Sequence, residues 1–384
     1  MRTLLPALLV TLWHPAYAQT FDQIDAAVNQ GIRRGIYPGA VVVIGRSDSV
    51  LYARGYGHFT WNRTSPVPTP DSTYWDIASI TKVMGTASAV MRLVDAGRVD
   101  LHAPVRRYLP RFSGGPKDQV TVRMLLDHTS GLRSYAPFFK HSRSRAGAIE
   151  LLYAERLTRR PGDLPVYSDL NAILLGLVIE SVSGMPLDRF VSREVFEQLE
   201  LAHTTYHPTP AIRRRTVPTA LWRGHPVQGQ VNDPNALLLG GAAGHAGIFS
   251  TGMDLARYAQ VWLRSGTGPS GQWVSAPTVQ LFLTRGTNSG PRLLGWDTPE
   301  LNLDEPSLFG TLISDAAYGH TGFTGTQVWI DPTRNLFLIF LTNRTFDPKV
   351  RNSLHGLRDV RVALSDAAIR LVPHTCQQEL VAQC

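Results

Sequence analysis

Strand-forming segments lie near both ends of this sequence, and their placement constrains the fold more than any other feature. Residues 40–45 are rich in valine and isoleucine, and a short polar turn joins them to a second strand-like segment at residues 50–55. Residues 326–330 and 336–341 repeat this arrangement near the other end, around a turn that contains proline and asparagine. Such pairs are typical of β-hairpins. The sequence therefore predicts an antiparallel sheet built from both chain ends.

The chain between the two hairpins has helical periodicity. Apolar side chains form one stripe at the α-helical period over residues 80–94 and a second over residues 170–182. Gly97 and Gly184 follow these stripes, as expected where helices end. We predict a mixed α/β (α+β) fold in which helices flank the sheet and a mostly helical lobe, at about residues 80–210, is inserted. Residues 19–375 would form a single domain.

The first 18 residues resemble a secretory signal peptide. Arg2 precedes an apolar stretch over residues 4–13, and Ala16-Tyr17-Ala18 offers a cleavage site after Ala18. A membrane anchor is the alternative, but the apolar stretch contains Pro6 and is shorter than the roughly 20 residues that span a bilayer. We therefore expect export to the periplasm or the medium, with no membrane segment in the mature chain.

Both cysteines, Cys376 and Cys384, lie in a predicted C-terminal tail at residues 376–384. In an oxidising compartment they could form a disulfide, or they could remain free thiols at a frayed end. Neither arrangement makes them catalytic.

The net charge of the chain is +8, which raises the possibility of nucleic-acid binding. Nucleic-acid binding requires basic residues gathered on a stripe or helix face. The longest basic run is only Arg213-Arg214-Arg215, between proline-containing segments. We therefore expect a solvated basic surface and no nucleic-acid partner. Affinity for anionic material of the cell envelope is a further hypothesis.

Ser79-Ile80-Thr81-Lys82 opens the first predicted helix, and its spacing suggests a chemical role. Residues three apart share a helix face, so the Ser79 hydroxyl and the Lys82 amine can meet. A serine becomes a good nucleophile when a base takes its proton, and a desolvated lysine can be that base. Backbone N–H groups at a helix start favour developing negative charge. The alternative is that Ser79 only caps the helix.

Two further segments contain residues suited to the same chemistry. Tyr167 precedes Ser168, which reads as the cap of the second predicted helix, and in a cationic site its hydroxyl could relay a proton. The glycine-rich segment 319–325, with His320 and Thr321, precedes the final hairpin and would let another molecule approach its backbone. Taken singly, the tyrosine could be a packing residue and the glycine-rich segment a turn.

Together these three motifs resemble the serine β-lactamase and penicillin-binding protein superfamily, which has Ser-x-x-Lys, Tyr-x-Asn and Lys-Thr-Gly or His-Thr-Gly in this order. The similarity is greatest to the class C-like branch of D-alanyl-D-alanine carboxypeptidases and esterases. Further stretches that match this branch are residues 125–132, 243–250 and 341–343. The resemblance spans residues 39–343 and implies a β-lactamase/transpeptidase-like fold.

The resemblance implies that Ser79 attacks an acyl carbonyl and forms an acyl-enzyme, which water hydrolyses. Lys82 and Tyr167 would share the proton transfers. The backbone N–H groups of Ser79 and Phe323 would form the oxyanion hole, beside Gly322. His320 and Thr321 would line the strand edge that holds the substrate. No cofactor and no metal are implied.

Two residues differ from those usual in the β-lactamases of this family. Asp169 replaces asparagine and cannot donate a hydrogen bond to a substrate carbonyl, although it could hold Lys82 charged or orient it. His320 replaces a lysine, and at its reference pKa it would charge only below about pH 6.5. We therefore expect peptidase or esterase activity on a peptide or small-molecule substrate rather than efficient β-lactam hydrolysis. The alternative function is a penicillin-binding sensor that acylates without turnover.

Other histidines suggested competing sites. His203 and His207 have the spacing of a helical metal pair, but Pro208 follows them, so we expect loop residues. His128 beside Asp127 could belong to a Ser-His-Asp triad, and His245 could approach the site. We expect structural roles for both.

Overall fold

The computed structural model describes residues 15–299 and 307–371. Residues 1–14 of the predicted signal peptide lie outside the described residues, as do Cys376 and Cys384. The signal peptide, the domain limits and the disulfide therefore remain predictions.

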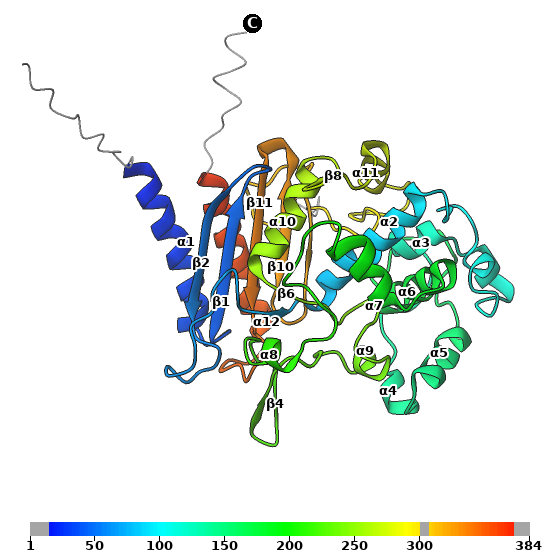
Figure 1. Cartoon of the computed structure of the whole chain (residues 1–384), viewed down its shortest axis with the longest axis horizontal. Helices are drawn as coiled ribbons and strands as arrows, with labels where there is room; N and C mark the ends of the chain where they lie inside the picture. Colours follow the sequence, from blue (N-terminus) through cyan, green and yellow to red (C-terminus); the bar gives the residue numbers. More distant parts are fainter. Residues whose placement is uncertain (1–14, 300–306, 372–384) are drawn as a thin grey trace, which may run out of the picture.

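A five-stranded antiparallel sheet forms one side of the molecule (Figure 1). Its order is β2 (Val50–Gly57), β1 (Gly39–Gly45), β11 (Leu336–Thr342), β10 (Gln327–Asp331) and β9 (Tyr318–Thr321). The first and last predicted hairpins meet at the centre, where Val42 pairs with Phe340. The predicted fold is thus confirmed. The residue pattern alone did not predict the edge strand β9, because its four residues include glycine, histidine and threonine rather than an apolar run; only the family resemblance implied a strand edge at His320 and Thr321.

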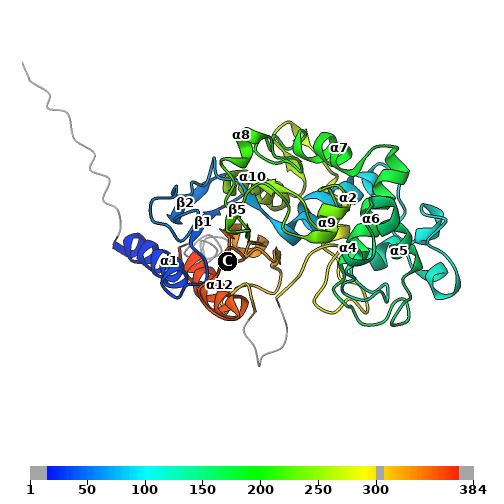
Figure 2. The same cartoon turned by 90° about the horizontal axis from the view of Figure 1, so that it is seen from below.

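Helices cover both faces of the sheet, which explains why β1 and β11 are apolar along their whole length. Helices α1 (Pro15–Arg33) and α12 (Ser353–Arg370) pack against Val42 and its neighbours on one face. Figure 2 shows these two helices side by side. Helix α10 (Gly252–Leu263) packs on the other face, where Val41 and Val43 join the larger core.

The helical lobe lies beside the β9 edge of the sheet, opposite the β2 edge (Figure 1). Its helices between residues 105 and 196 are η3 (Val105–Arg107), η4 (Gly115–Gln119), α3 (Val122–Leu126), α4 (Phe138–His141), α5 (Arg145–Ala154), α6 (Asp169–Ser183), α7 (Leu187–Val191) and η5 (Ser192–Phe196). From the later chain, α9 (Pro234–Leu238) packs against α4, and α11 (Ala276–Phe282) packs against α2 (Ser88–Asp95).

Short elements complete the described chain. They are α8 (Pro210–Arg213), η6 (Pro332–Arg334) and three two-stranded pairs: β3 (Trp75–Asp76) with β6 (Phe249–Ser250), β4 (Ala220–Trp222) with β5 (His225–Val227), and β7 (Thr267–Gly268) with β8 (Gly271–Gln272).

Helix α6 is buried through most of its length and ends, as predicted, at Gly184 in the left-handed conformation. Within the described residues, no single helix is long and apolar enough to cross a membrane. Among the described helices, α6 and the following helix over residues 187–196 are the one pair that together has the required length and composition, and the two are bent by 77° from one another.

The first predicted helix is less regular than its apolar stripe suggested. It begins as the 3₁₀ turn η1 (Ala78–Ile80), widens into the π-helical segment η2 (Lys82–Ala87) and becomes α-helical only at Ser88. The Val83 carbonyl accepts hydrogen bonds from Ser88 Oγ and Tyr258 Oη, both at 2.9 Å, which satisfy it inside the wide turn. Wide helical turns are frequent at functional sites.

Candidate active site

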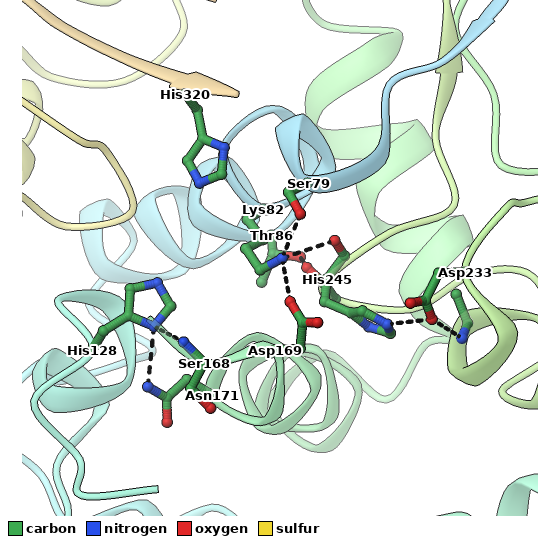
Figure 3. Close-up of polar contacts among 12 residues, drawn as sticks. Ser79, Lys82, Thr86, His128, Ser168, Asp169, Asn171, Asp233, His245 and His320 are labelled. Carbon is green, nitrogen blue, oxygen red and sulfur yellow. Dashed lines mark hydrogen bonds and ion pairs between the residues drawn. The ribbon is translucent and has the colours of Figure 1, made fainter. Parts of the chain in front are cut away.

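A cleft of about 690 Å³ lies between the edge strand β9 and the helical lobe, a size typical of small-molecule sites. Its wall contains the predicted residues Ser79, Tyr167, Asp169, His320, Thr321, Gly322 and Phe323. Lys82 lies behind Ser79 and is 4% exposed. The structure therefore brings all eight sequence-predicted site residues together (Figure 3 shows four of them).

The backbone before Ser79 is held in a strained conformation. Ala78 has a φ of 48°, which is unfavourable for a residue with a Cβ atom. Its N–H donates to Asp76 Oδ1 at 2.9 Å, and the Asn232 N–H donates to Asp76 Oδ2 at 2.7 Å. Burial raises the pKa of Asp76 to about 6, although these two hydrogen bonds oppose the rise. Asp76 thus fixes the turn that presents Ser79 to the cleft.

Lys82 directs all three protons of an ammonium group at acceptors. Its Nζ donates to Ser79 Oγ at 3.0 Å and to the His245 carbonyl at 3.2 Å, and it pairs with Asp169 Oδ1 at 2.7 Å (Figure 3). Burial alone would lower the pKa of Lys82, but the charge of Asp169, with further contributions from hydrogen bonding to Asp169 and from Tyr167, outweighs burial, so the pKa lies above its ordinary value. In the resting site Lys82 is therefore a cation.

Asp169 is the first residue of α6, where its carboxylate lies near the positive end of the helix dipole. Burial would raise the pKa of Asp169, yet the neighbouring Lys82 and His245 charges hold it below its ordinary value. Ser168 occupies the cap position, as predicted. Its hydroxyl, however, donates to the Arg133 carbonyl at 2.6 Å instead of accepting from the helix.

Tyr167 lies against three side chains that carry or accept protons. Its ring centre is 4.9 Å from Lys82 Nζ, 4.9 Å from the His128 ring and 5.9 Å from the His320 ring. We had expected a cationic site to ease loss of its proton. Instead, burial raises the pKa of Tyr167 and outweighs the opposing charge of Lys82. Tyr167 is therefore a neutral phenol in the resting site.

His320 is 2% exposed, so its environment differs from that of a free histidine. Its Nδ1–H donates to the Thr321 carbonyl at 2.8 Å, and its Nε2 has no hydrogen-bond partner among the described residues. Burial lowers the pKa of His320 to about 4, with the nearby Asp297 charge opposing and the Lys82 and Arg292 charges adding to the fall. The ring is thus uncharged at neutral pH.

Because His320 is buried, substrate binding should not show the pH dependence near 6.5 that its reference pKa predicts. Because His320 gains a proton only near pH 4, binding of a carboxylate-bearing substrate should not depend on His320 between about pH 5 and 8. The KM of such a substrate, measured against pH for the wild type and H320N, should give parallel profiles. A step near pH 6.5 that H320N abolishes would show that the histidine carries charge.

The turn after β9 is tied to the backbone before Ser79. Gly322 N–H donates to the Thr326 carbonyl at 2.8 Å, and Thr326 Oγ1 donates to the Ile77 carbonyl at 3.0 Å. Thr324 Oγ1 donates to the Asp76 carbonyl at 2.7 Å. A Cβ atom at Gly322 would lie 2.6 Å from the Ile77 carbonyl oxygen, so this close approach requires glycine. The turn places Phe323, the second predicted oxyanion residue, in the cleft wall.

His245 and Asp233 are also part of this site, although the sequence predicts only a structural role for His245 and no role for Asp233. His245 Nε2–H donates to Asp233 Oδ1 at 2.8 Å, and the His245 carbonyl holds Lys82. Gly244 lets this segment approach α6, since a Cβ there would lie 1.9 Å from the Ala172 carbonyl oxygen. The Asp-Pro start of α9 and the glycines around His245 were the available sequence signals.

His128 has the structural role that we expected. Its Nδ1 accepts from the Ser168 N–H at 3.1 Å, and Asn171 Nδ2 lies 3.2 Å away. Burial lowers the pKa of His128 well below its ordinary value, helped by the Arg292 and Lys82 charges. Asp127 instead accepts from Thr129, so the two residues do not form the relay of a triad.

Asp169, Asp233 and His245 are also the residues that could hold a metal in the described part of the chain. One ligand atom from each lies within 4.8 Å of the others. Lys82 already pairs with Asp169, however, and His245 donates to Asp233. The atoms that would bind a metal are therefore already engaged with one another and with Lys82.

A serine whose hydroxyl contacts a buried lysine, at the edge of an antiparallel sheet and under a helical lobe, defines the class of active-serine hydrolases that use Ser-x-x-Lys. The chain belongs to the β-lactamase family, because the family model described as Beta-lactamase matches residues 24–362.

Curated relatives of similar length support this assignment. The chain is 32% identical over 362 residues to an N-acetylmuramyl-L-alanine amidase of Bacillus subtilis (strain 168), covering 85% of this chain and 82% of that protein. It is 30% identical over 374 residues to an Escherichia coli (strain K12) protein provisionally named D-alanyl-D-alanine carboxypeptidase, covering 86% and 83%.

Solved structures share the fold. A class C β-lactamase superposes with a TM-score of 0.73 at 18% identity, covering 94% of this chain and 98% of that one. EstCE1, a hydrolase with promiscuous acyltransferase activity, superposes with a TM-score of 0.71 at 22% identity, covering 91% and 99%. The protein is thus a serine hydrolase of the β-lactamase family.

Proposed function

We propose that the protein is an exported hydrolase that forms an acyl-enzyme on Ser79 and cleaves a peptide, amide or ester bond. The observation that carries this proposal is the 3.0 Å contact between Ser79 Oγ and Lys82 Nζ in the cleft wall. Hydrolysis in two steps, acylation and deacylation, needs a nucleophile with a base in reach, and this pair supplies both.

Proton transfer must begin with Lys82, because an ammonium group cannot accept a proton. Asp169 Oδ1, at 2.7 Å, is the nearest of its three acceptors and would take one proton. The resulting amine would accept the Ser79 proton as Oγ bonds to the substrate carbonyl carbon. Tyr167, whose ring lies 4.9 Å from Lys82 Nζ, would give its phenol proton to the leaving group and take in return the proton that Lys82 received from Ser79. The backbone N–H groups of Ser79 and Phe323 would stabilise the oxyanion.

The substrate that we propose is a peptidoglycan-like peptide or a small ester. Relatives at 30–32% identity carry the names of an amidase and a carboxypeptidase, which act on such bonds. The predicted signal peptide supports export to the compartment that holds these substrates. The neutral His320 supports weak recognition of a β-lactam carboxylate at this position, since the charged lysine usual in the β-lactamases is absent.

Mass spectrometry after exposure to penicillins, cephalosporins, D-Ala-D-Ala peptides and short-chain esters tests the proposal. We expect a covalent adduct on Ser79 that disappears as product accumulates in steady state. A stoichiometric burst that stops after one turnover would favour the penicillin-binding sensor, because the charged Lys82 would then fail to activate water. No adduct at Ser79 with any compound, despite turnover, would contradict the proposed nucleophile.

A further inference from the structure

The β4–β5 hairpin projects away from the body of the molecule (Figure 1). Its strands pair only with each other, three residues from each side. Arg223 and Gly224 join them with φ angles of 48° and 80°, the positive angles of a tight hairpin turn. Two-stranded hairpins without a covering layer are marginally stable by themselves. This hairpin nevertheless exposes its largest apolar side chains.

The tip of the hairpin is apolar on both faces. Trp222 is 67% exposed and Leu221 is 44% exposed. They are consecutive residues of one strand, so they point to opposite faces. Pro226, which pairs with Leu221, is exposed as well. A flat partner surface would cover only one of the two faces, whereas a medium that surrounds the tip would cover both.

Four arginines that have no carboxylate partner among the described residues lie at this tip and its base. Arg223 stacks on Trp222, with its guanidinium carbon 5.7 Å from the ring centre. The exposed run Arg213-Arg214-Arg215 lies at the base, where Arg213 packs beside Gly229 just after β5. Among the described residues, none of these four arginines pairs with a carboxylate; Arg213 and Arg215 donate to backbone carbonyls. The basic run that the sequence predicts to be solvated surface is therefore part of a basic patch beside an apolar tip.

This combination selects one kind of partner. Strand addition by another protein is disfavoured, because each strand is three residues long and Pro226 lacks a backbone donor. Tryptophan favours the interface between lipid headgroups and acyl chains, and arginines favour anionic headgroups. We propose that the β4–β5 hairpin attaches the protein peripherally to an anionic phospholipid surface, with Leu221 and Trp222 inserted and the four arginines at the headgroups.

The hairpin is also fixed to the wall of the cleft. Asn232, which lines the cleft, donates from Nδ2 to the Thr219 carbonyl at the start of the hairpin, at 3.3 Å. A membrane-bound molecule would therefore hold its cleft at a set distance from the lipid. The attachment itself does not depend on the proposed reaction.

Flotation of the purified full chain with vesicles tests this inference. We expect binding to phosphatidylcholine vesicles that contain phosphatidylglycerol, weakening as salt is added, and little binding to phosphatidylcholine alone. The double variant L221S/W222S should lose most of the binding. R214Q and R223Q should each lower the affinity for anionic vesicles by about fivefold, which is the contribution expected from one basic residue near an anionic membrane surface.

Matched controls are L164S and R63Q, which alter an exposed leucine and an exposed arginine in other loops and should bind like the wild type. Thermal unfolding midpoints of all variants should agree, because the altered side chains are exposed. Absence of wild-type binding to anionic vesicles, or full binding by L221S/W222S, would overturn the proposal. So would Trp222-dependent binding to purified peptidoglycan without binding to vesicles, since the partner would then be a glycan.

Discussion

Replacing Ser79 with alanine should abolish covalent labelling and lower turnover on the order of 10⁶-fold, the loss seen when a serine protease is deprived of its nucleophile. The hydroxyl is the only group of Ser79 that can bond to an acyl carbon, and it is the atom that Lys82 contacts at 3.0 Å. The fold should persist, because the variant gives up one hydrogen bond worth about 1 kcal/mol. Intact-protein mass spectrometry and ester hydrolysis measure the two effects.

S79C is the matched control, because it keeps a nucleophilic atom at the same position. It should still form a covalent adduct with compounds that acylate the wild type, while S79A should not. Wild-type rates of ester hydrolysis in a well-folded S79A would place the nucleophile elsewhere.

Replacing Asp169 with asparagine should change both stability and the pH dependence of catalysis. Lys82 is 4% exposed, and its partner's side chain is 20% exposed, so the variant leaves a buried cation without its counter-ion. Breaking a buried pair costs about 3–5 kcal/mol, and this is an upper limit because Lys82 can release its proton. With burial unopposed, the pKa of Lys82 falls, and the acidic limb of the acylation rate should move to lower pH.

The sign of the stability change follows from both groups. The raised pKa of Lys82 contributes stability that is lost as pH rises through that pKa, and the lowered pKa of Asp169 contributes stability that is lost as pH falls through its own. The free energy of unfolding of the wild type should therefore exceed that of D169N by a nearly constant amount between about pH 5 and 9, and the difference should shrink below about pH 4 and above about pH 10. Urea unfolding from about pH 3 to 11 measures it.

D188N is the control for the loss of a carboxylate. Asp188 pairs with the exposed His207 at 3.1 Å, and surface pairs contribute about 0–1 kcal/mol. This variant should leave the pH–rate profile unchanged. If the pH–rate profile of D169N were identical to that of the wild type, Asp169 would not control the protonation of Lys82.

Much of the sheet and the site could be predicted because the signals are local. The β-branched runs at residues 40–45 and 336–341 mark strands wherever they occur, and Ser79 and Lys82 share a helix face by spacing alone. The residues that match family motifs, including His320, all come together at one cleft.

The remaining features depend on burial and on contacts between distant segments. The uncharged state of His320 follows from its enclosure by other parts of the chain, and so does the neutral phenol of Tyr167. The pairing of His245 with Asp233 depends on how a glycine segment packs against α6. No single stretch of sequence carries that information.

The tie between the turn at Thr324–Thr326 and the backbone of Asp76 and Ile77 has a consequence for how the protein matures. These hydrogen bonds join segments about 250 residues apart, and β1 has no central partner until β11 exists. Contacts of such long sequence separation form slowly. The ribosome would therefore have synthesised most of the chain before the turn that precedes Ser79 could fold. A chain that ends before β9 should therefore lack activity, because it cannot form these hydrogen bonds.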